Sequence, residues 1–229
     1  MAFKKVRNLS EDDHLLVSEA VGEAEKTTDG EIVTIVSSQS NDYSDVGLVW
    51  AAIAAFIAMS FTAFYPAPYL EILTNLLGSW DNEIGFGEFA WLITSIGALK
   101  FLGVWLFMKW KPALMFFTPK WIKSQRVRER AINLFRVGTE SKTAGKTGVL
   151  IYLSMAEHRA EIVADAAINE HVGVEKWGDA MATLITHVKN HEPGRGMAEA
   201  ARQIGVILTE YFPKSDGNPN ELPDKLIDL

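Results

Sequence analysis

The stretch VGLVWAAIAAFIAMSFTAFY, residues 46–65, contains no charged side chain. A second run, FAWLITSIGALKFLGVWLFM at residues 89–108, contains only one, Lys100. An α-helix rises about 1.5 Å per residue, so about 20 residues are enough to cross the roughly 30 Å apolar core of a bilayer. Both runs have this length, and only residues 66–88 separate them. The sequence therefore predicts a hairpin of two transmembrane helices over residues 46–108.

The charges that flank the two runs predict which way the hairpin is oriented. Residues 66–88 carry four acidic residues and no basic one, whereas residues 100–130 carry eight Lys or Arg against one Glu. Segments rich in Lys and Arg stay on the cytoplasmic side of a membrane. Residues 1–13 also lack the apolar core of a signal peptide. We therefore expect a multi-pass protein of the inner (cytoplasmic) membrane, with both termini and the soluble domain in the cytoplasm.

The segment after the second run, residues 109–123, combines aromatic and basic side chains. Such a segment suits the interface of a bilayer, where anionic headgroups attract bases and Trp rings lie at the headgroup level. Nucleic-acid binding is the less favoured interpretation of the same charges. The bases expected at the membrane surface are Lys109, Lys111, Lys120, Lys123 and Arg126.

The remaining sequence predicts one α/β domain that the hairpin interrupts. Strands are expected where β-branched and aliphatic residues run together, at residues 31–37, 148–154 and 159–164, and the last two should pair as an antiparallel hairpin. Helices are expected at residues 10–26, with a capping box from Ser10 to Asp13, and at residues 124–137, 165–172, 176–189 and 197–212. Residues 1–45 and 124–213 together would form a sheet of about three or four strands flanked by helices, followed by a tail at residues 214–229.

This pattern resembles the TPM domain family, whose members carry a phosphatase-like domain. The resemblance lies in TDGEIVTIV (residues 28–36), RAINLF (130–135), KTGVLIYLS (146–154), RAEIVA (159–164) and the helix that ends in YFP (211–213). It covers about 140 residues outside the hairpin. It implies a sheet with flanking helices, and members of the family have been described as acid phosphatases, calcium binders and auxiliary factors of membrane complexes.

Three carboxylates follow strands of the predicted sheet and are candidate metal ligands. Asp42 and Asp45 follow the first strand, and Asp165 follows the third. Strand ends that meet at one edge of an α/β sheet can form a shared crevice, where carboxylates would bind Ca²⁺ or Mg²⁺. His158 and Arg159 would then lie at another edge. Helix caps and solvated loop acids are the alternative interpretation.

Two other motifs are weaker. Gly145-Lys146-Thr147 looks like the end of a P-loop, but the required glycine is replaced by Glu140 and the segment joins a helix to a strand, so we expect no nucleotide. His187 and His191 have a metal-ligand spacing without a third ligand in a motif. The chain has no cysteine, which excludes disulfides and thiolate metal sites.

Lys100 is the only charge inside the predicted spans. A Lys at the centre of a transmembrane helix costs about 2.5–3.5 kcal/mol on insertion scales. It either snorkels to the headgroups, lies nearer a shifted span boundary, or faces a group of another subunit.

The function that these observations favour is non-enzymatic. We expect a membrane-anchored TPM-like domain that binds or assists another membrane protein, or associates with itself, in the lipid bilayer. The alternatives are a metal-dependent phosphatase, for which no nucleophile is recognisable, and a Ca²⁺-binding module.

Overall fold

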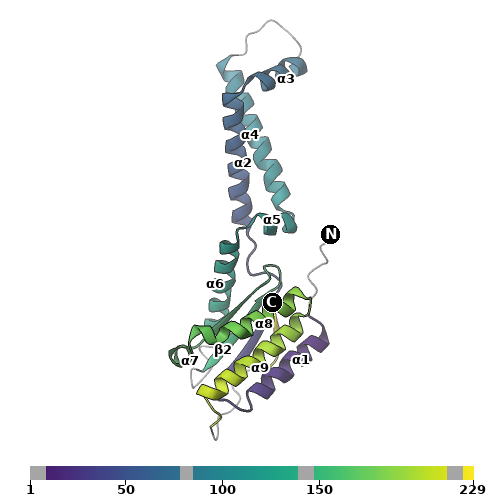
Figure 1. Ribbon diagram of the computed structural model, residues 1–229. Helices are drawn as coiled ribbons and strands as arrows, with labels where there is room; N and C mark the ends of the chain where they lie inside the picture. The colour runs from purple at the N-terminus through teal and green to yellow at the C-terminus, as the bar shows by residue number, and fades with distance from the viewer. Residues whose placement is uncertain (1–8, 78–84, 139–146, 216–223) are drawn as a thin grey trace. The chain divides into compact units, whose positions relative to one another are not determined.

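A computed structural model describes residues 9–77, 85–138, 147–215 and 224–229. The chain divides into two compact units, which are described separately here (Figure 1). The α/β unit contains Met1–Asn41 and Lys120–Leu229, and the helical unit contains Asp42–Pro119.

The α/β unit is built on a mixed sheet, which confirms the predicted α/β class. Its described strands are β1 (Glu31–Ser37), β2 (Gly148–Ser154), β3 (Arg159–Ala164) and β4 (Ile227–Asp228), in the spatial order β3-β2-β1-β4. β1 is parallel to β2 and β4, and β3 is antiparallel to β2. The first three strands have the predicted bounds. β4 was not predicted, because it lies in the segment expected to be a tail.

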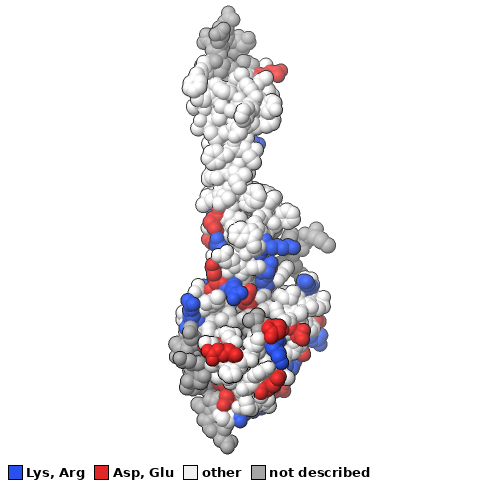
Figure 2. Space-filling view, turned by 60° about the vertical axis from the view of Figure 1, so that its left-hand side comes forward, with Lys and Arg blue, Asp and Glu red and all other residues white. Residues whose placement is uncertain are grey.

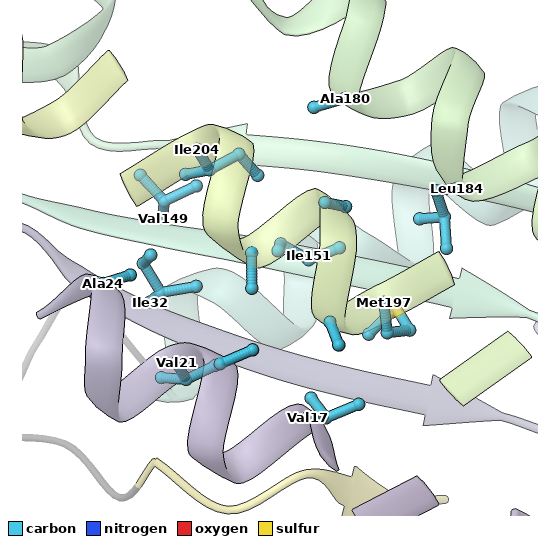
Figure 3. Close-up of a cluster of buried hydrophobic side chains, with 14 of the residues drawn as sticks. Val17, Val21, Ala24, Ile32, Val149, Ile151, Ala180, Leu184, Met197 and Ile204 are labelled. Atoms are coloured by element: carbon cyan, nitrogen blue, oxygen red, sulfur yellow. The ribbon is translucent and has the colours of Figure 1, made fainter. Parts of the chain in front are cut away.

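One face of the sheet is covered by three helices, α1 (Glu11–Ala24), α8 (Gly178–Lys189) and α9 (Pro193–Tyr211). Figure 3 shows how Val21 of α1, Ile204 of α9 and Leu184 of α8 surround Ile32 and Ile151 of the strands. The capping box predicted at the start of α1 is present. α7 (Ala166–His171) and a 3₁₀ helix (Val174–Trp177) connect β3 to α8.

α6 (Lys120–Gly138) covers the opposite face of the sheet. Its buried residues Val127, Ala131 and Phe135 pack on Leu150 and Tyr152 of β2. Because helices cover both faces, every residue of β1 and β2 is buried, as their near-continuous apolar sequences indicate. α6 begins at Lys120 rather than at Ser124, so the end of the segment predicted to be interfacial, residues 120–123, is the first turn of this helix.

The helical unit contains α2 (Ser44–Phe64), α3 (Ala67–Leu77), α4 (Phe86–Met108) and α5 (Lys111–Phe117). α3 occupies part of the segment predicted to be the loop between the spans. α2 and α4 are long and apolar enough to cross a membrane, with mean hydropathies of 2.0 and 1.6 over their most apolar 18 residues.

α2 and α4 pack directly against each other along the helical unit (Figure 1). Small residues allow their close approach. A Cβ at Gly97 of α4 would lie 2.6 Å from the Met59 side chain, and a Cβ at Gly47 of α2 would lie 3.2 Å from Met108 Cβ. Small residues in this role are typical of helices that associate in membranes.

Candidate functional site

α2 and α4 expose many large apolar side chains. Only 28% and 11% of their most apolar segments are buried within the chain, whereas the core helix of a water-soluble protein is mostly buried. Phe64 is 81% exposed, Leu99 71% and Phe56 70%. An open apolar depression on α2 is lined by Phe56, Ile57, Ser60, Phe61, Phe64 and Tyr65. Leaving so much apolar surface in water would be costly, and a bilayer removes that cost.

The charged side chains are distributed very differently over the two units. In the face shown in Figure 2, most of the helical unit is free of Lys, Arg, Asp and Glu, whereas charged residues of both signs are scattered over the α/β unit. Within α2, the 20 residues from Val46 to Tyr65 include no charge at all. This contrast matches a helical unit solvated by lipid and an α/β unit solvated by water.

Aromatic and basic side chains gather where α2 begins and α4 ends, next to α5. Trp50 donates a hydrogen bond from Nε1 to the carbonyl oxygen of Phe117, at 3.1 Å, and the two rings pack edge to face. The ammonium group of Lys109 lies 4.7 Å from the centroid of the Trp105 ring. Trp110, the residue that precedes α5, and Phe116 within it are both exposed. This composition is typical of a bilayer interface.

Lys100 lies on α4 and is exposed. It is eight residues before Met108, the last residue of the helix, which corresponds to about 12 Å along the axis. Among the residues that the structure describes, Lys100 forms no ion pair with a carboxylate.

A buried polar cluster lies at the edge of the sheet where β1 and β2 end. Ser40 donates from Oγ to Oγ of Ser154 (2.8 Å), and its hydroxyl also lies 2.9 Å from the hydroxyl of Tyr152. Ser154 in turn donates to Glu157, and Glu157 accepts the backbone N–H of Ser40 at 3.0 Å. This Ser40–Ser154–Glu157 cluster holds the segment that follows β1 against the β2–β3 turn.

The cluster is closed rather than open to a substrate. Ser154 is completely buried and Glu157 is 7% exposed. A serine beside a carboxylate resembles a nucleophile with its base, but a nucleophile must reach the reacting atom, and Ser154 reaches only protein groups. The cluster therefore supplies rigidity at this edge.

Three cationic side chains flank this cluster. Arg126 of α6 donates to Oδ1 of Asn41 at 2.6 Å. Partial burial and the nearby guanidinium of Arg159 lower the pKa of Lys123, although the carboxylate of Glu157 partly opposes them. Lys123 and Arg126, predicted at the membrane surface, are thus half-buried against the α/β unit, whereas Lys109, Lys111 and Lys120 are exposed.

Asp165 lies at the other edge of the sheet. β3 runs antiparallel to β2, so its end at Ala164 pairs with Val149, near the beginning of β2. The expectation that the first and third strands end at one shared edge is therefore wrong. The edge where β1 ends instead contains Arg159, because Ser154 pairs with Arg159.

The carboxylate of Asp165 has a structural partner. Asp165 is 5% exposed, and its Oδ2 accepts the backbone N–H of Gly148 at 2.9 Å. Its own N–H donates to the carbonyl oxygen of Gly148, also at 2.9 Å. These two bonds hold the start of β2 beside the end of β3.

The other candidate ligands form two separate pairs, one at the start of α2 and one at the end of α8. Asp42 accepts the N–H of Ser44 before α2, and Asp45 is exposed in the first turn of α2. His187 lies 3.2 Å from Glu192, and His191 has a left-handed backbone conformation. Within the described ranges, no three His, Asp or Glu side chains are grouped as a metal site requires. Gly145 and Lys146 lie outside the described residues.

One titratable group that sequence reasoning missed is Glu25, the C-cap residue of α1. Its Oε1 accepts the N–H of Ile32 at 2.7 Å, whereas the buried Oε2 accepts no hydrogen bond from the described residues. Burial raises the pKa of Glu25 to about 8, against the Ile32 hydrogen bond, and the nearby Glu31 and Asp224 raise it further. In the protonated form, Oε2 can donate to Asp224.

The sequence matches no protein-family profile and no curated protein sequence. The fold is similar to the NMR structure of the BA42 protein from the psychrophilic bacterium Bizionia argentinensis, with a TM-score of 0.56 and 17% identical residues. The similarity covers 100% of both chains. At this level of identity the similarity supports the fold alone, and any activity has to be inferred from the chain's own residues.

Proposed function

We propose that this protein is anchored in a membrane by the hairpin of α2 and α4 and that it binds or assists another membrane protein. The observation that carries the proposal is that two helices of 21 and 23 residues pack on each other yet expose most of their apolar side chains. Water would oppose that exposure and lipid would not. The proposal places the protein in the inner membrane, with Lys- and Arg-rich flanks in the cytoplasm.

The α/β unit is proposed to be a TPM-like domain that serves as a rigid binding module. The resemblance in sequence pattern and the mixed sheet with helices on both faces support this assignment. Within the Ser40–Ser154–Glu157 cluster, Ser154 and Glu157 are buried and hydrogen-bonded to each other, which favours binding over catalysis at this edge. Among the described residues, no specific contact favours the phosphatase alternative.

The membrane part of the proposal is tested by alkaline carbonate extraction of membranes from cells that express the full chain. An inserted hairpin keeps the protein in the pellet, because high pH breaks the ionic contacts of peripheral proteins but does not extract apolar helices from lipid. A matched variant, Phe56→Glu with Ile57→Lys, places charges in the middle of α2 and should shift the protein to the supernatant. Release of the unaltered protein would contradict membrane anchoring.

The non-enzymatic part is tested separately with the detergent-purified protein. Hydrolysis of a generic phosphate ester is measured across pH with Ca²⁺, Mg²⁺, Mn²⁺ or a chelator, and Ser154→Ala and Asp165→Asn are the matched variants. We expect equal background rates in all three proteins. Metal-dependent turnover that either variant abolishes would establish the phosphatase instead.

A further inference from the structure

Lys100 shares a face of α4 with Gly103 and Phe107, because residues three and seven positions apart lie on one side of a helix. All three are exposed. A Cβ at Gly103 would have no heavy atom within 4 Å, whereas a Cβ at Gly97 would meet Met59 of α2. The Lys100 face, defined by Lys100, Gly103 and Phe107, is thus an exposed face of α4 beside the one that packs on α2 through Gly97.

The two apolar spans of the hairpin contain no carboxylate that can neutralise Lys100. Neither residues 46–65 nor residues 89–108 include an Asp or a Glu. The nearest acidic residue of α4, Glu88, is 12 residues away, or about 18 Å along the axis. A second copy of this hairpin has the same composition, so self-association brings no carboxylate to the depth of Lys100.

Snorkelling is poorly suited to this position. The end of α4 that is closer to Lys100 is its C-terminus, at Met108. Side chains of an α-helix lean towards its N-terminus, so the Lys100 side chain leans towards the middle of the span and away from the nearer headgroups. A Lys that snorkels easily lies near the N-terminal end of a helix or within the last turn.

We propose that the Lys100 face binds a transmembrane helix of a different protein, and that this helix carries an Asp or Glu at the depth of Lys100. The carboxylate would pair with the ammonium group in the bilayer, where an unpaired charge is costly. Gly103, with open space around it, lets the partner's backbone approach closely. This inference rests on the proposed membrane insertion and specifies the chemistry of the partner.

The test uses the full-length protein in phosphatidylcholine vesicles. Since the chain has no cysteine, Phe86→Cys, at the exposed start of α4, supplies a single site for a fluorescent donor. The probes are acceptor-labelled leucine-based transmembrane peptides of about 21 residues. One has a central Asp, and its control has Leu at that position. We expect about tenfold tighter association of the Asp peptide, a difference that Lys100→Arg keeps and Lys100→Leu abolishes.

A second variant keeps the proposal open to contradiction. Gly103→Ile leaves the charge in place but fills the approach site, so it should weaken binding of the Asp peptide. Equal binding of both peptides, or an Asp preference that survives Lys100→Leu, would overturn the proposal. So would loss of self-association in Lys100→Leu without any peptide, because a second copy would then be the occupant. If the protein does not float with the vesicles, the membrane anchor fails as well; if it floats without preferring Asp, only this inference fails.

Discussion

Protonation of Glu25 makes the stability of the fold depend on pH. Its pKa is raised from an ordinary 4.5 to about 8 by burial and by the carboxylates of Glu31 and Asp224. Between these two pH values the folded chain holds a proton that the unfolded chain releases. The stability that protonated Glu25 contributes is therefore complete below about pH 4.5 and is lost as the pH rises through about 8.

Replacing Glu25 by Gln should remove this pH dependence. The Gln amide oxygen can still accept the N–H of Ile32, but it brings no charge into the site. At pH 9 we expect Glu25→Gln to be more stable than the unaltered protein, by up to about 5 kcal/mol, because the pKa rises from 4.5 to about 8 and each pKa unit corresponds to about 1.4 kcal/mol. Urea unfolding followed by circular dichroism at pH 5, 7 and 9 measures the effect. The exposed Glu19→Gln on α1 is the control, and identical pH profiles for Glu25→Gln and the unaltered protein would contradict the assignment.

Asp165 is a second residue whose main partner is the backbone. Asp165→Ala leaves the N–H of Gly148 buried without its acceptor, so we expect the free energy of unfolding to fall by about 1–3 kcal/mol. Asp165→Asn keeps an acceptor oxygen and should lose less. Glu170→Ala, exposed on the neighbouring α7, is the control. If Ca²⁺ raised the melting temperature of the unaltered protein but not that of Asp165→Asn, Asp165 would be a metal ligand instead.

At the scale of elements, the contact between α2 and α4 can be fixed covalently. A Cβ at position 47 lies 3.2 Å from Met108 Cβ, close to the roughly 3.5–4.5 Å of a disulfide. We expect Gly47→Cys with Met108→Cys to form an intramolecular disulfide under mild oxidation, seen as a mobility shift that reductant reverses. Gly47→Cys with Leu106→Cys, on the exposed face of α4, should not form one. Equal oxidation of both pairs would contradict this packing.

Elements with a strong local pattern could be predicted from the sequence. β1 and β2 have the predicted bounds because long runs of aliphatic and β-branched residues are a local signal of a buried strand, and the half-buried β3 could be predicted from its short apolar run directly after β2. β4 has only two residues, and it exists because Ile227 pairs with Ile35, nearly the whole chain away. α3 was not predicted because the segment between the spans was interpreted from its acidic residues alone, and the apolar residues of Ala67–Leu77 were not considered as a helix.

The candidate site was harder to predict than the fold. Ser40 and Ser154 are 114 residues apart and neither belongs to a motif, so their contact could not be predicted from the local sequence. The prediction that Asp165 shares an edge of the sheet with Asp42 and Asp45 was wrong because it did not take the direction of β3 into account. The antiparallel pairing of β3, itself predicted, places Asp165 at the start of β2.

At the scale of the whole molecule, the division into two units explains why average composition is uninformative. The helical unit has apolar surfaces suited to lipid, and the α/β unit has mixed charges suited to water (Figure 2). The helical unit is inserted between Asn41 and Lys120, so the chain leaves the α/β unit after Asn41 and returns to it at Lys120. A hairpin returns the chain to the side of the membrane from which it started, so a single α/β unit can fold from both flanking parts.

The most direct test of this account is cysteine accessibility in intact cells. Single cysteines are introduced at Glu71 in α3, Phe56 in α2 and Ser215 after α9, and a membrane-impermeant maleimide is added before or after lysis. The account predicts that Glu71→Cys is labelled in intact cells, that Ser215→Cys is labelled only after lysis, and that Phe56→Cys resists labelling until detergent is added. Labelling of Phe56→Cys as rapid as that of Ser215→Cys in detergent-free lysates would contradict a membrane-spanning hairpin.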